Sequence, residues 1–387
     1  MNLLTNILIA YSYIYSSYFL IFSIASLFKL RPKSNSETLG KFLILIPAYK
    51  EDNVIIETAK SALSNGYPSD KFQVVIIADS FKESTLTNLR KLPLKVHEVD
   101  FEFSTKAKAI NSALEALNRD DFNWVLILDA DNRLSEDSLH IFNGCMQTGA
   151  KAAQGHRMGH NDSDQASFAI LDAISEEINN NIFRKGHRVL GLSSALIGSG
   201  MCFEISFFNK MMSGLNGVGD EDGGLEFRIF NAREKIEYLE KCYVFDEKVD
   251  SAHVFGKQRT RWIAGQFTYI TKHFNDFVKA VLQLNIDVIN KYLQKYLLPR
   301  LLFIGLITLS IIGLFFIDTS GAYLLLGSLG VFILANLFAI PKKFYKLKYL
   351  RVFLELPKAL FYLFKEIFTS KGTLKKNFHT PHKTVSK

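Results

Sequence analysis

The stretch Trp124-Val125-Leu126-Ile127-Leu128-Asp129-Ala130-Asp131 decides the fold of this chain. Its first five residues are apolar without alternation, which is typical of a strand buried on both faces in a parallel sheet. Asp129 and Asp131 should therefore emerge at the carboxyl end of a strand, the edge where open α/β sheets bind ligands. Two hard oxygen ligands one residue apart suit Mg²⁺ or Mn²⁺. Taken alone, the acidic pair also fits a helix cap ahead of Ser135-Glu136-Asp137.

Similar apolar runs alternate with helical patterns between about residues 40 and 250, which predicts an α/β sheet. The expected strands are Phe42–Ile46, stopped by Pro47, then Val74–Ala78, Lys95–Phe101 and Ala152–Met158. The expected helices are Asp52–Ser64, Lys106–Leu117 and Asp164–Phe183, with a glycine-rich turn at Gly198-Ser199-Gly200.

Polar residues follow the first strands at the predicted ligand-binding edge. Pro47-Ala48-Tyr49-Lys50-Glu51-Asp52 comes after the first strand and Asp79 after the second. Both positions suit a base or a ribose, although an ordinary strand-to-helix turn explains the first equally well. Lys106 and Lys108 begin the next helix and could approach a phosphate, but solvated lysines are the default expectation.

A second acidic pair, Glu221-Asp222, lies in the glycine-rich segment Gly217–Gly224. Adjacent acids repel one another, which raises the pKa of at least one of them toward that of a useful general base. A plain acidic loop is the alternative reading.

A basic and aromatic segment, Gln258-Arg259-Thr260-Arg261-Trp262, follows the second acidic pair. Arginine recognises phosphate through two parallel hydrogen bonds, and tryptophan offers a flat apolar surface to a sugar ring. An amphipathic helix beside a membrane, with an interfacial tryptophan, is the competing interpretation.

Three uncharged runs are long enough to cross a bilayer core of roughly 30 Å. They are Leu3–Phe28, Leu301–Ile317 and Ala322–Ile340. A cleaved signal peptide is a less favoured reading of the first run, because a basic region precedes the apolar part of such peptides and here basic residues follow it. Lysine and arginine flank the runs on one side only, which predicts a multi-pass protein of the cell (inner or plasma) membrane. Its central domain should lie in the cytoplasm and its amino terminus outside.

The net charge of +8 over 387 residues comes largely from these flanks and from a Lys-rich tail. Charge that follows membrane boundaries argues against nucleic-acid binding. Two further segments, Phe277–Leu298 and Val352–Phe368, are apolar on one side and adjoin the spans, so interfacial helices are favoured over core helices. Cys145, Cys202 and Cys242 have no metal-ligand spacing and should be reduced packing residues.

Taken together, these motifs have the order seen in membrane-bound glycosyltransferases of family 2. The motifs are Pro47–Asp52, Asp79, Lys108-Ala109-Ile110-Asn111, Asp129-Ala130-Asp131, Glu221-Asp222 and Gln258-x-x-Arg261-Trp262. The chain resembles that group, which includes cellulose, chitin, hyaluronan and poly-N-acetylglucosamine synthases and ceramide glucosyltransferase, over roughly residues 40–270. It departs from the group at Ala78-Asp79-Ser80, where paired aspartates are usual, and the extra Asp220 leaves the register of the general base open by one residue.

The resemblance implies a GT-A (Rossmann-like) fold and gives the motif residues their roles. It makes Asp222 the catalytic base and Asp129 and Asp131 the ligands of a Mg²⁺ or Mn²⁺ cofactor. The donor-binding residues would be Ala48, Tyr49, Glu51, Asp79, Lys108, Asp129 and Asp131. Gln258, Arg261 and Trp262 would shape the acceptor end and steady the diphosphate, and Gly198–Gly200 would lie beside the acceptor.

We therefore expect an amino-terminal transmembrane helix, a GT-A domain, an interfacial helix, a transmembrane hairpin and a final interfacial helix with a basic tail. The corresponding boundaries are 1–30, 40–270, 275–300, 301–340 and 350–387. The expected activity is inverting transfer from a nucleotide-sugar, with a UDP-sugar favoured, to a growing polysaccharide, with an export partner possible. The alternatives are a lipid acceptor and an inactive membrane scaffold. Intact acidic motifs argue against the scaffold.

Overall fold

The computed structural model describes residues 3–30, 37–159, 167–217, 220–246, 269–271, 273–346, 349 and 351–369. The chain divides into two compact units. One unit contains residues 31–161 and 193–247 together with the last residues of the chain. The other contains residues 1–30, 162–192 and 248–374. Each unit is described by itself below.

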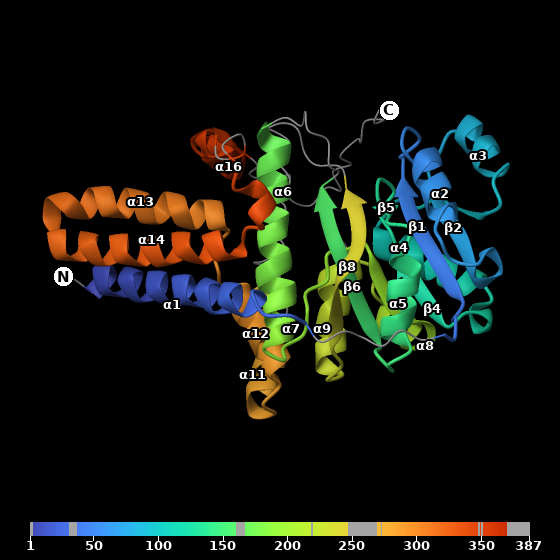
Figure 1. The fold of residues 1–387 in the computed structure, drawn as a ribbon, viewed down its shortest axis with the longest axis horizontal. Helices are drawn as coiled ribbons and strands as arrows, with labels where there is room; N and C mark the ends of the chain where they lie inside the picture. Colours follow the sequence, from blue (N-terminus) through green and yellow to red (C-terminus); the bar gives the residue numbers. More distant parts are fainter. Residues whose placement is uncertain are drawn as a thin grey trace. The chain divides into compact units, whose positions relative to one another are not determined.

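An eight-stranded mixed sheet forms the centre of the first unit, with the order β3-β2-β1-β4-β7-β6-β8-β5 (Figure 1). Its strands are β1 (Phe42–Tyr49), β2 (Phe72–Asp79), β3 (Lys95–Val99), β4 (Trp124–Ile127), β5 (Arg133–Leu134), β6 (Ala152–Gly159), β7 (Met201–Glu204) and β8 (Ile236–Asp246). The first four strands are parallel, and β7 pairs antiparallel to both β4 and β6. The predicted α/β sheet is confirmed.

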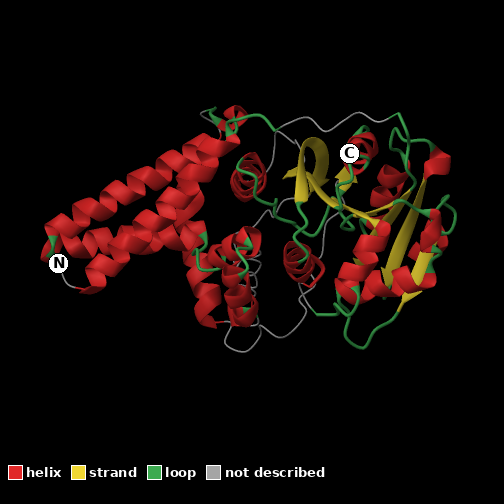
Figure 2. Ribbon diagram, turned by 90° about the horizontal axis from the view of Figure 1, so that it is seen from below, coloured by secondary structure: helices red, strands yellow, loops and turns green. Residues whose placement is uncertain are grey.

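Helices pack against this sheet, which is why its central strands are apolar on both faces (Figure 2). They are α2 (Ile55–Leu63), α3 (Glu83–Leu89), α4 (Lys106–Ala116), α5 (Ser138–Met146), α8 (Ile205–Met212) and α9 (Leu225–Asn231). Buried residues of α2, α3 and α5 share one core cluster with alternate residues of β1 and β2. Helix α4 contacts β1, β2 and β3. All three cysteines, distant in sequence, lie buried in the α2–α5 core cluster.

Strand β1 continues through Pro47, where the sequence predicted its end. Its pairing with β4 finishes at Leu45, whereas its pairing with β2 runs on to Tyr49. Beyond Leu45 the strand is therefore an edge on its β4 side, and a proline there removes no ladder hydrogen bond on that side. This extension carries Ala48 and Tyr49 to the carboxyl edge of the sheet.

The described residues of the second unit include three helices that are long and apolar enough to cross a membrane, consistent with membrane association: α1 (Leu3–Ser26), α13 (Arg300–Ile317) and α14 (Thr319–Ala339). Helix α14 packs against both α1 and α13 (Figure 1). The buried Ser16 and Ser328 hydroxyls form a hydrogen bond of 3.1 Å between α1 and α14. Two serines can approach this closely because their side chains are small, a common device of helix packing in membranes.

The other helices of this unit are α6 (Ser167–Asn179), α7 (His187–Val189), α11 (Phe274–Leu282), α12 (Ile286–Gln294) and α16 (Leu356–Thr369). Helix α6 continues into a π-helical segment, Asn180–Gly186, that packs on α1. This helix, which was predicted within the transferase domain, groups with the three long apolar helices in the second unit. The predicted amphipathic segment 277–298 is two helices, broken near Leu284, whose φ is +52°. The interfacial position of these helices stays a prediction.

Candidate active site

The carboxyl ends of β1, β2 and β4 meet at the switch point of the sheet. Strands β2 and β3 follow on one side of β1, whereas β4 lies on its other side, so the connections diverge between β1 and β4. Tyr49 is in register with Asp79, and the Leu128 amide donates to the Leu45 carbonyl at 3.1 Å. Ligands of open α/β sheets bind at such a crevice. The structure therefore gathers the residues that follow these three strands at one edge.

The first part of this edge is built from the ends of β1 and β2. Asp79 is 3% exposed, and its carboxylate accepts a hydrogen bond of 2.9 Å from the Ser80 hydroxyl. Lys50 and Ser80, the residues directly after the two strands, have φ values of +56° and +59°. Non-glycine residues in this region store strain and are concentrated at ligand-binding positions. Ala48 and Glu51, also predicted donor contacts, are buried beside them.

Asp129 and Asp131 follow β4 directly, as predicted. The Asp129 amide donates to the Ser199 hydroxyl at 2.9 Å, and its carboxylate accepts a hydrogen bond from the Lys106 ammonium group. Burial raises the pKa of Asp131 well above its ordinary value, and the charges of Asp246 and Asp129 raise it further. Repulsion of this kind is relieved by a cation, so the pair fits a divalent metal. Among the described residues, no group of three His, Cys, Asp or Glu gathers as a complete metal site.

Lys106 and Lys108 begin α4, but only Lys106 reaches the acidic residues. Its ammonium group contacts Asp129 and donates to the Gly198 carbonyl at 2.6 Å. The Lys108 ammonium instead donates to the Phe103 carbonyl at 2.8 Å and lies over the Phe103 ring. A helix presents residues two positions apart to different sides, which explains the divergence. The donor contact assigned to Lys108 by resemblance stays a prediction, and of these two lysines it is Lys106 whose ammonium group contacts Asp129.

Lys106 also interacts electrostatically with residues of both acidic pairs. Burial lowers the pKa of Lys106, but the charges of Asp129, Glu221 and Asp222 outweigh burial and raise it overall. The ammonium group consequently stays charged. A single, partly buried cation that interacts with Asp129 and with the later pair places both pairs in one site.

Glu221 and Asp222 lie in a π-helical turn, Asp220–Gly224, that leads into α9. The Gly223 amide donates to the Asp222 carboxylate. A Cβ atom placed on Gly198 would lie 3.9 Å from Asp222 Oδ2 and 3.8 Å from Lys106 Nζ. Burial raises the pKa of Glu221 to about 7, and the Asp222 charge adds to the shift. Asp222 thus faces the Gly198 position, whose carbonyl accepts the hydrogen bond from Lys106.

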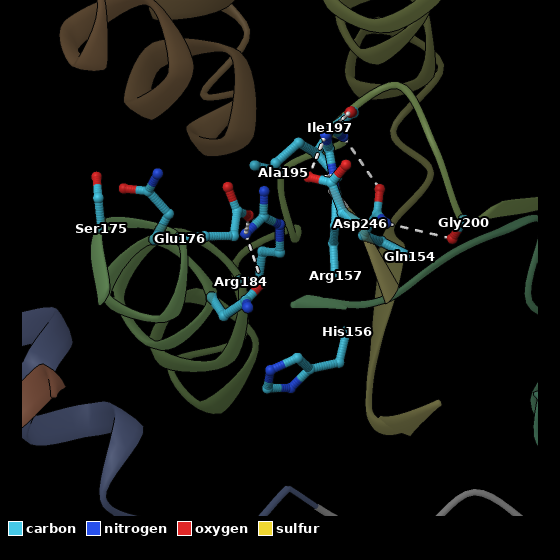
Figure 3. Close-up of polar contacts among 12 residues, drawn as sticks. Gln154, His156, Arg157, Ser175, Glu176, Arg184, Ala195, Ile197, Gly200 and Asp246 are labelled. Atoms are coloured by element: carbon cyan, nitrogen blue, oxygen red, sulfur yellow. Dashed lines mark hydrogen bonds and ion pairs between the residues drawn. The ribbon is translucent and has the colours of Figure 1, made fainter. Parts of the chain in front are cut away.

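That loop, Ile197–Gly200, is held by residues of β6 that the sequence analysis did not identify. Gln154 and Arg157 contact it, and Arg157 forms an ion pair with Asp246 (Figure 3). The sequence signal that could have identified them is the presence of a glutamine and an arginine within a strand that is otherwise rich in small apolar residues. The predicted residues Gln258, Arg261 and Trp262 lie outside the described residues, so their role stays a prediction.

Comparison with known proteins agrees with this geometry. A model of the family described as "Glycosyltransferase like family 2" matches residues 40–265. The protein YdaM of Bacillus subtilis (strain 168), described as a probable glycosyltransferase, is 23% identical over 257 residues, which are 64% of this chain and 60% of YdaM. The poly(ribitol-phosphate) beta-N-acetylglucosaminyltransferase TarS of Staphylococcus aureus (strain Mu50) is 27% identical over 103 residues, 26% of this chain and 18% of TarS. The chain thus spans less than two thirds of either relative.

A solved structure shares the fold. The mannosyltransferase PcManGT from Pyrobaculum calidifontis, in complex with GDP-Man and Mn²⁺, aligns with a TM-score of 0.61 at 16% identity and covers 95% of this chain and all of its own. At this identity the likeness concerns the fold, and it confirms the predicted GT-A architecture. Because the family match covers more than half of the sequence and includes both acidic pairs, the chain belongs to the family described as "Glycosyltransferase like family 2".

Proposed function

We propose that this chain transfers a sugar from a nucleotide-sugar to an acceptor hydroxyl with inversion, and that the reaction depends on a divalent metal. The observation that carries the proposal is the convergence of Asp129 and Asp222 on Lys106. It joins a carboxylate suited to the donor side with one suited to the acceptor side, as single displacement requires. The Mn²⁺ in PcManGT is consistent with a metal-dependent reaction.

The residues at the sheet edge would have different roles in the reaction. The β1 and β2 ends would hold the nucleoside, with Asp79 as its buried hydrogen-bonding partner. Asp129 and Asp131 would hold Mg²⁺ or Mn²⁺, which, when bound, offsets the negative charge of the leaving diphosphate. Lys106, cationic and partly buried next to Asp129, would remain beside that charge and stabilise it as it develops.

Asp222 would accept the proton of the acceptor hydroxyl. Its carboxylate faces Gly198, so a hydroxyl beside the Ile197–Gly200 loop would lie between the base and the donor end. General-base catalysis by a positioned carboxylate contributes about 10²–10⁴-fold to a rate. Glu221, whose pKa is raised to about 7, is the neighbouring residue and would limit the charge next to the base.

A growing polysaccharide at the cytoplasmic face of the membrane is the proposed acceptor. The three apolar helices would anchor the site there, and α11, α12 and α16 would lie in the interface. Exposed apolar side chains on the first two helices support this position, including Val278, Val281, Leu282, Ile286 and Leu293. A single sugar added to a lipid is the alternative, and the size of the product distinguishes the two.

The test is release of nucleoside diphosphate by detergent-purified protein with a panel of UDP- and GDP-sugars, in the presence of Mg²⁺ or Mn²⁺. We expect turnover with one donor, and loss of at least about 10²-fold in Asp222→Asn with donor affinity retained. The matched control is Asp246→Asn, which removes a buried carboxylate elsewhere in the same unit and should weaken the donor side instead. Equal activity in Asp222→Asn and the unmodified protein would refute the assignment of the base.

A further inference from the structure

We propose that Gln154 is a positioning residue that holds the Ile197–Gly200 loop in place and thereby sets the acceptor side of the site. The inference rests on the proposed function, because it names the residue that fixes the distance between Asp222 and the donor end. Gln154 itself touches neither of these carboxylates. It acts through the loop.

The Gln154 side chain is fully buried in β6, and its amide is used almost entirely by the loop (Figure 3). Its Nε2 donates to the Ser199 carbonyl at 2.9 Å and to the Gly200 carbonyl at 3.2 Å. Its Oε1 accepts from the Ile197 amide at 3.1 Å. One side chain therefore satisfies backbone groups at both ends of the loop. A buried amide side chain is costly unless it is satisfied in this way, so the residue has a defined place.

The loop needs such a support because its own conformation is unusual. Gly198 and Gly200 have φ values of +82° and +63°. A Cβ atom on Gly200 would lie 2.6 Å from a Val244 methyl carbon, so β8 leaves room for glycine alone. Left-handed glycines lose much conformational freedom on folding, and the hydrogen bonds from Gln154 offset part of that cost.

The loop connects the donor side of the site with the acceptor side. Its Gly198 carbonyl accepts from Lys106, its Ser199 hydroxyl accepts from the Asp129 amide, and its Gly198 Cα side faces Asp222. A shift of the loop therefore changes the position of the acceptor relative to both. Misplacement of reacting groups by about 1 Å costs about 10²-fold in rate.

Arg157, also in β6, contacts the same loop, but it also forms interactions that lead to the donor side of the site. Its Nη1 donates to the Ile197 carbonyl at 3.4 Å, while its ion pair with Asp246 leads through Asn132 to the Asp131 carboxylate. Removal of Arg157 would disturb the donor side and the acceptor side together. Among the described residues, the Gln154 side chain forms hydrogen bonds only with the loop and with its own neighbour Gly155, so its substitution tests the acceptor side separately.

The experiment compares Gln154→Met, which keeps the length of the side chain but loses the amide, with Gln154→Asn, which keeps the amide on a shorter stem. The matched control is Asn143→Leu. Asn143 is an equally buried amide in α5 whose Nδ2 donates to the Thr38 carbonyl and whose Oδ1 accepts from the Gly40 amide, both at 2.9 Å, so its hydrogen bonds support a different segment of the chain. Full-length protein in detergent is assayed with the donor found above.

Two readouts are measured for each variant. The first is nucleoside diphosphate release, resolved into donor KM and kcat. The second is hydrogen–deuterium exchange of the peptide that covers Ile197–Gly200. For Gln154→Met we expect kcat to fall by about 10²-fold with donor KM within about 3-fold, and faster exchange in the loop. Gln154→Asn should recover part of the lost kcat. Asn143→Leu should keep kcat within about 3-fold of the unmodified protein, even if its melting temperature falls as far as that of Gln154→Met.

The proposal is overturned if Gln154→Met keeps its kcat while loop exchange accelerates, or if Asn143→Leu loses as much kcat as Gln154→Met. It is also overturned if exchange in the loop is unchanged. An unmodified protein that is silent with every donor would instead count against the proposed function. In that case the exchange measurement still decides whether Gln154 holds the loop.

Discussion

Replacement of Glu221 by glutamine should stabilise the protein above pH 7 and lose this effect toward pH 4.5. Burial raises the pKa of Glu221 from its ordinary 4.5 to about 7, the Asp222 charge raises it further, and Lys106 offsets part of the shift. Among the described residues, the Glu221 Oε2 atom is buried without a hydrogen-bond partner. The charged form of this carboxylate is therefore unfavourable in the folded protein.

The sign follows from proton binding. Between pH 4.5 and 7 the folded state keeps a proton on Glu221 that the unfolded state has lost, so stability falls as pH rises through this window. A shift of this size sets an upper bound of about 3 kcal/mol. Since the repulsion is shared with Asp222, we expect about 1–2 kcal/mol for Glu221→Gln at pH 8. That corresponds to a rise of about 2–8 °C in melting temperature for a unit of this size.

The assay is thermal unfolding of the detergent-purified chain from pH 5 to pH 9 with EDTA present, followed by the fluorescence of Trp124 and Trp262. Glu204→Gln is the control with the opposite sign. Burial raises the pKa of Glu204, but hydrogen bonds from Ser206 and Phe207 outweigh this effect and lower it overall, so the substitution should destabilise at pH 8. A Glu221→Gln variant that is less stable at pH 8, or that follows the pH dependence of the unmodified protein, would refute the reasoning.

Three further outcomes are expected. Lys106→Met should lower both the free energy of unfolding and kcat, because it removes the cation that contacts Asp129. Lys108→Met should change the free energy of unfolding by no more than about 0.5 kcal/mol and kcat by no more than about 3-fold. Unfolding and nucleoside diphosphate release are compared for the two variants. Gly200→Ala should lower the free energy of unfolding by about 2–3 kcal/mol, because the added methyl group clashes with β8. Gly191→Ala should lower it by only about 1 kcal/mol, because Gly191 has a positive φ but open space around it, and thermal unfolding compares the two. Removal of divalent metal by EDTA should abolish nucleoside diphosphate release, and added Mn²⁺ or Mg²⁺ should restore it.

The sheet itself was predictable because its central strands are buried on both faces. A run such as Val74–Ala78 can only be continuous and apolar if helices cover both sides, and the acidic residues that end such runs then share one edge. The continuation of β1 through Pro47 was not predictable, since it depends on where the β4 pairing ends. Of the predicted helix 164–183, residues 167–183 are confirmed as helical, but their grouping with the long apolar helices depends on contacts that periodicity does not encode.

The candidate site was predictable only as far as its acidic motifs. The choice between Lys106 and Lys108 depends on the rotation of α4 against the strand ends, which two lysines in one helical turn leave open. Cys145, Cys202 and Cys242 gave no sign that they meet in one core cluster, because the contact is made through three different elements. Spacing along the chain does not report such contacts.

The polar residues of β6 and β8 show where patterning fails and why. In β1 and β4 the buried positions are apolar, and in β2 they are apolar up to its last residue, Asp79, whereas β6 buries Gln154 and β8 ends on Asp246, which is 4% exposed. A strand that serves only packing has no reason to bury such groups, because each costs free energy unless it is satisfied. Here the partners are the Ile197–Gly200 loop and the residues after β4. The polar departures therefore follow the path from the metal-binding pair to the base, as expected when the departures from a hydrophobic pattern mark the functional part of a fold.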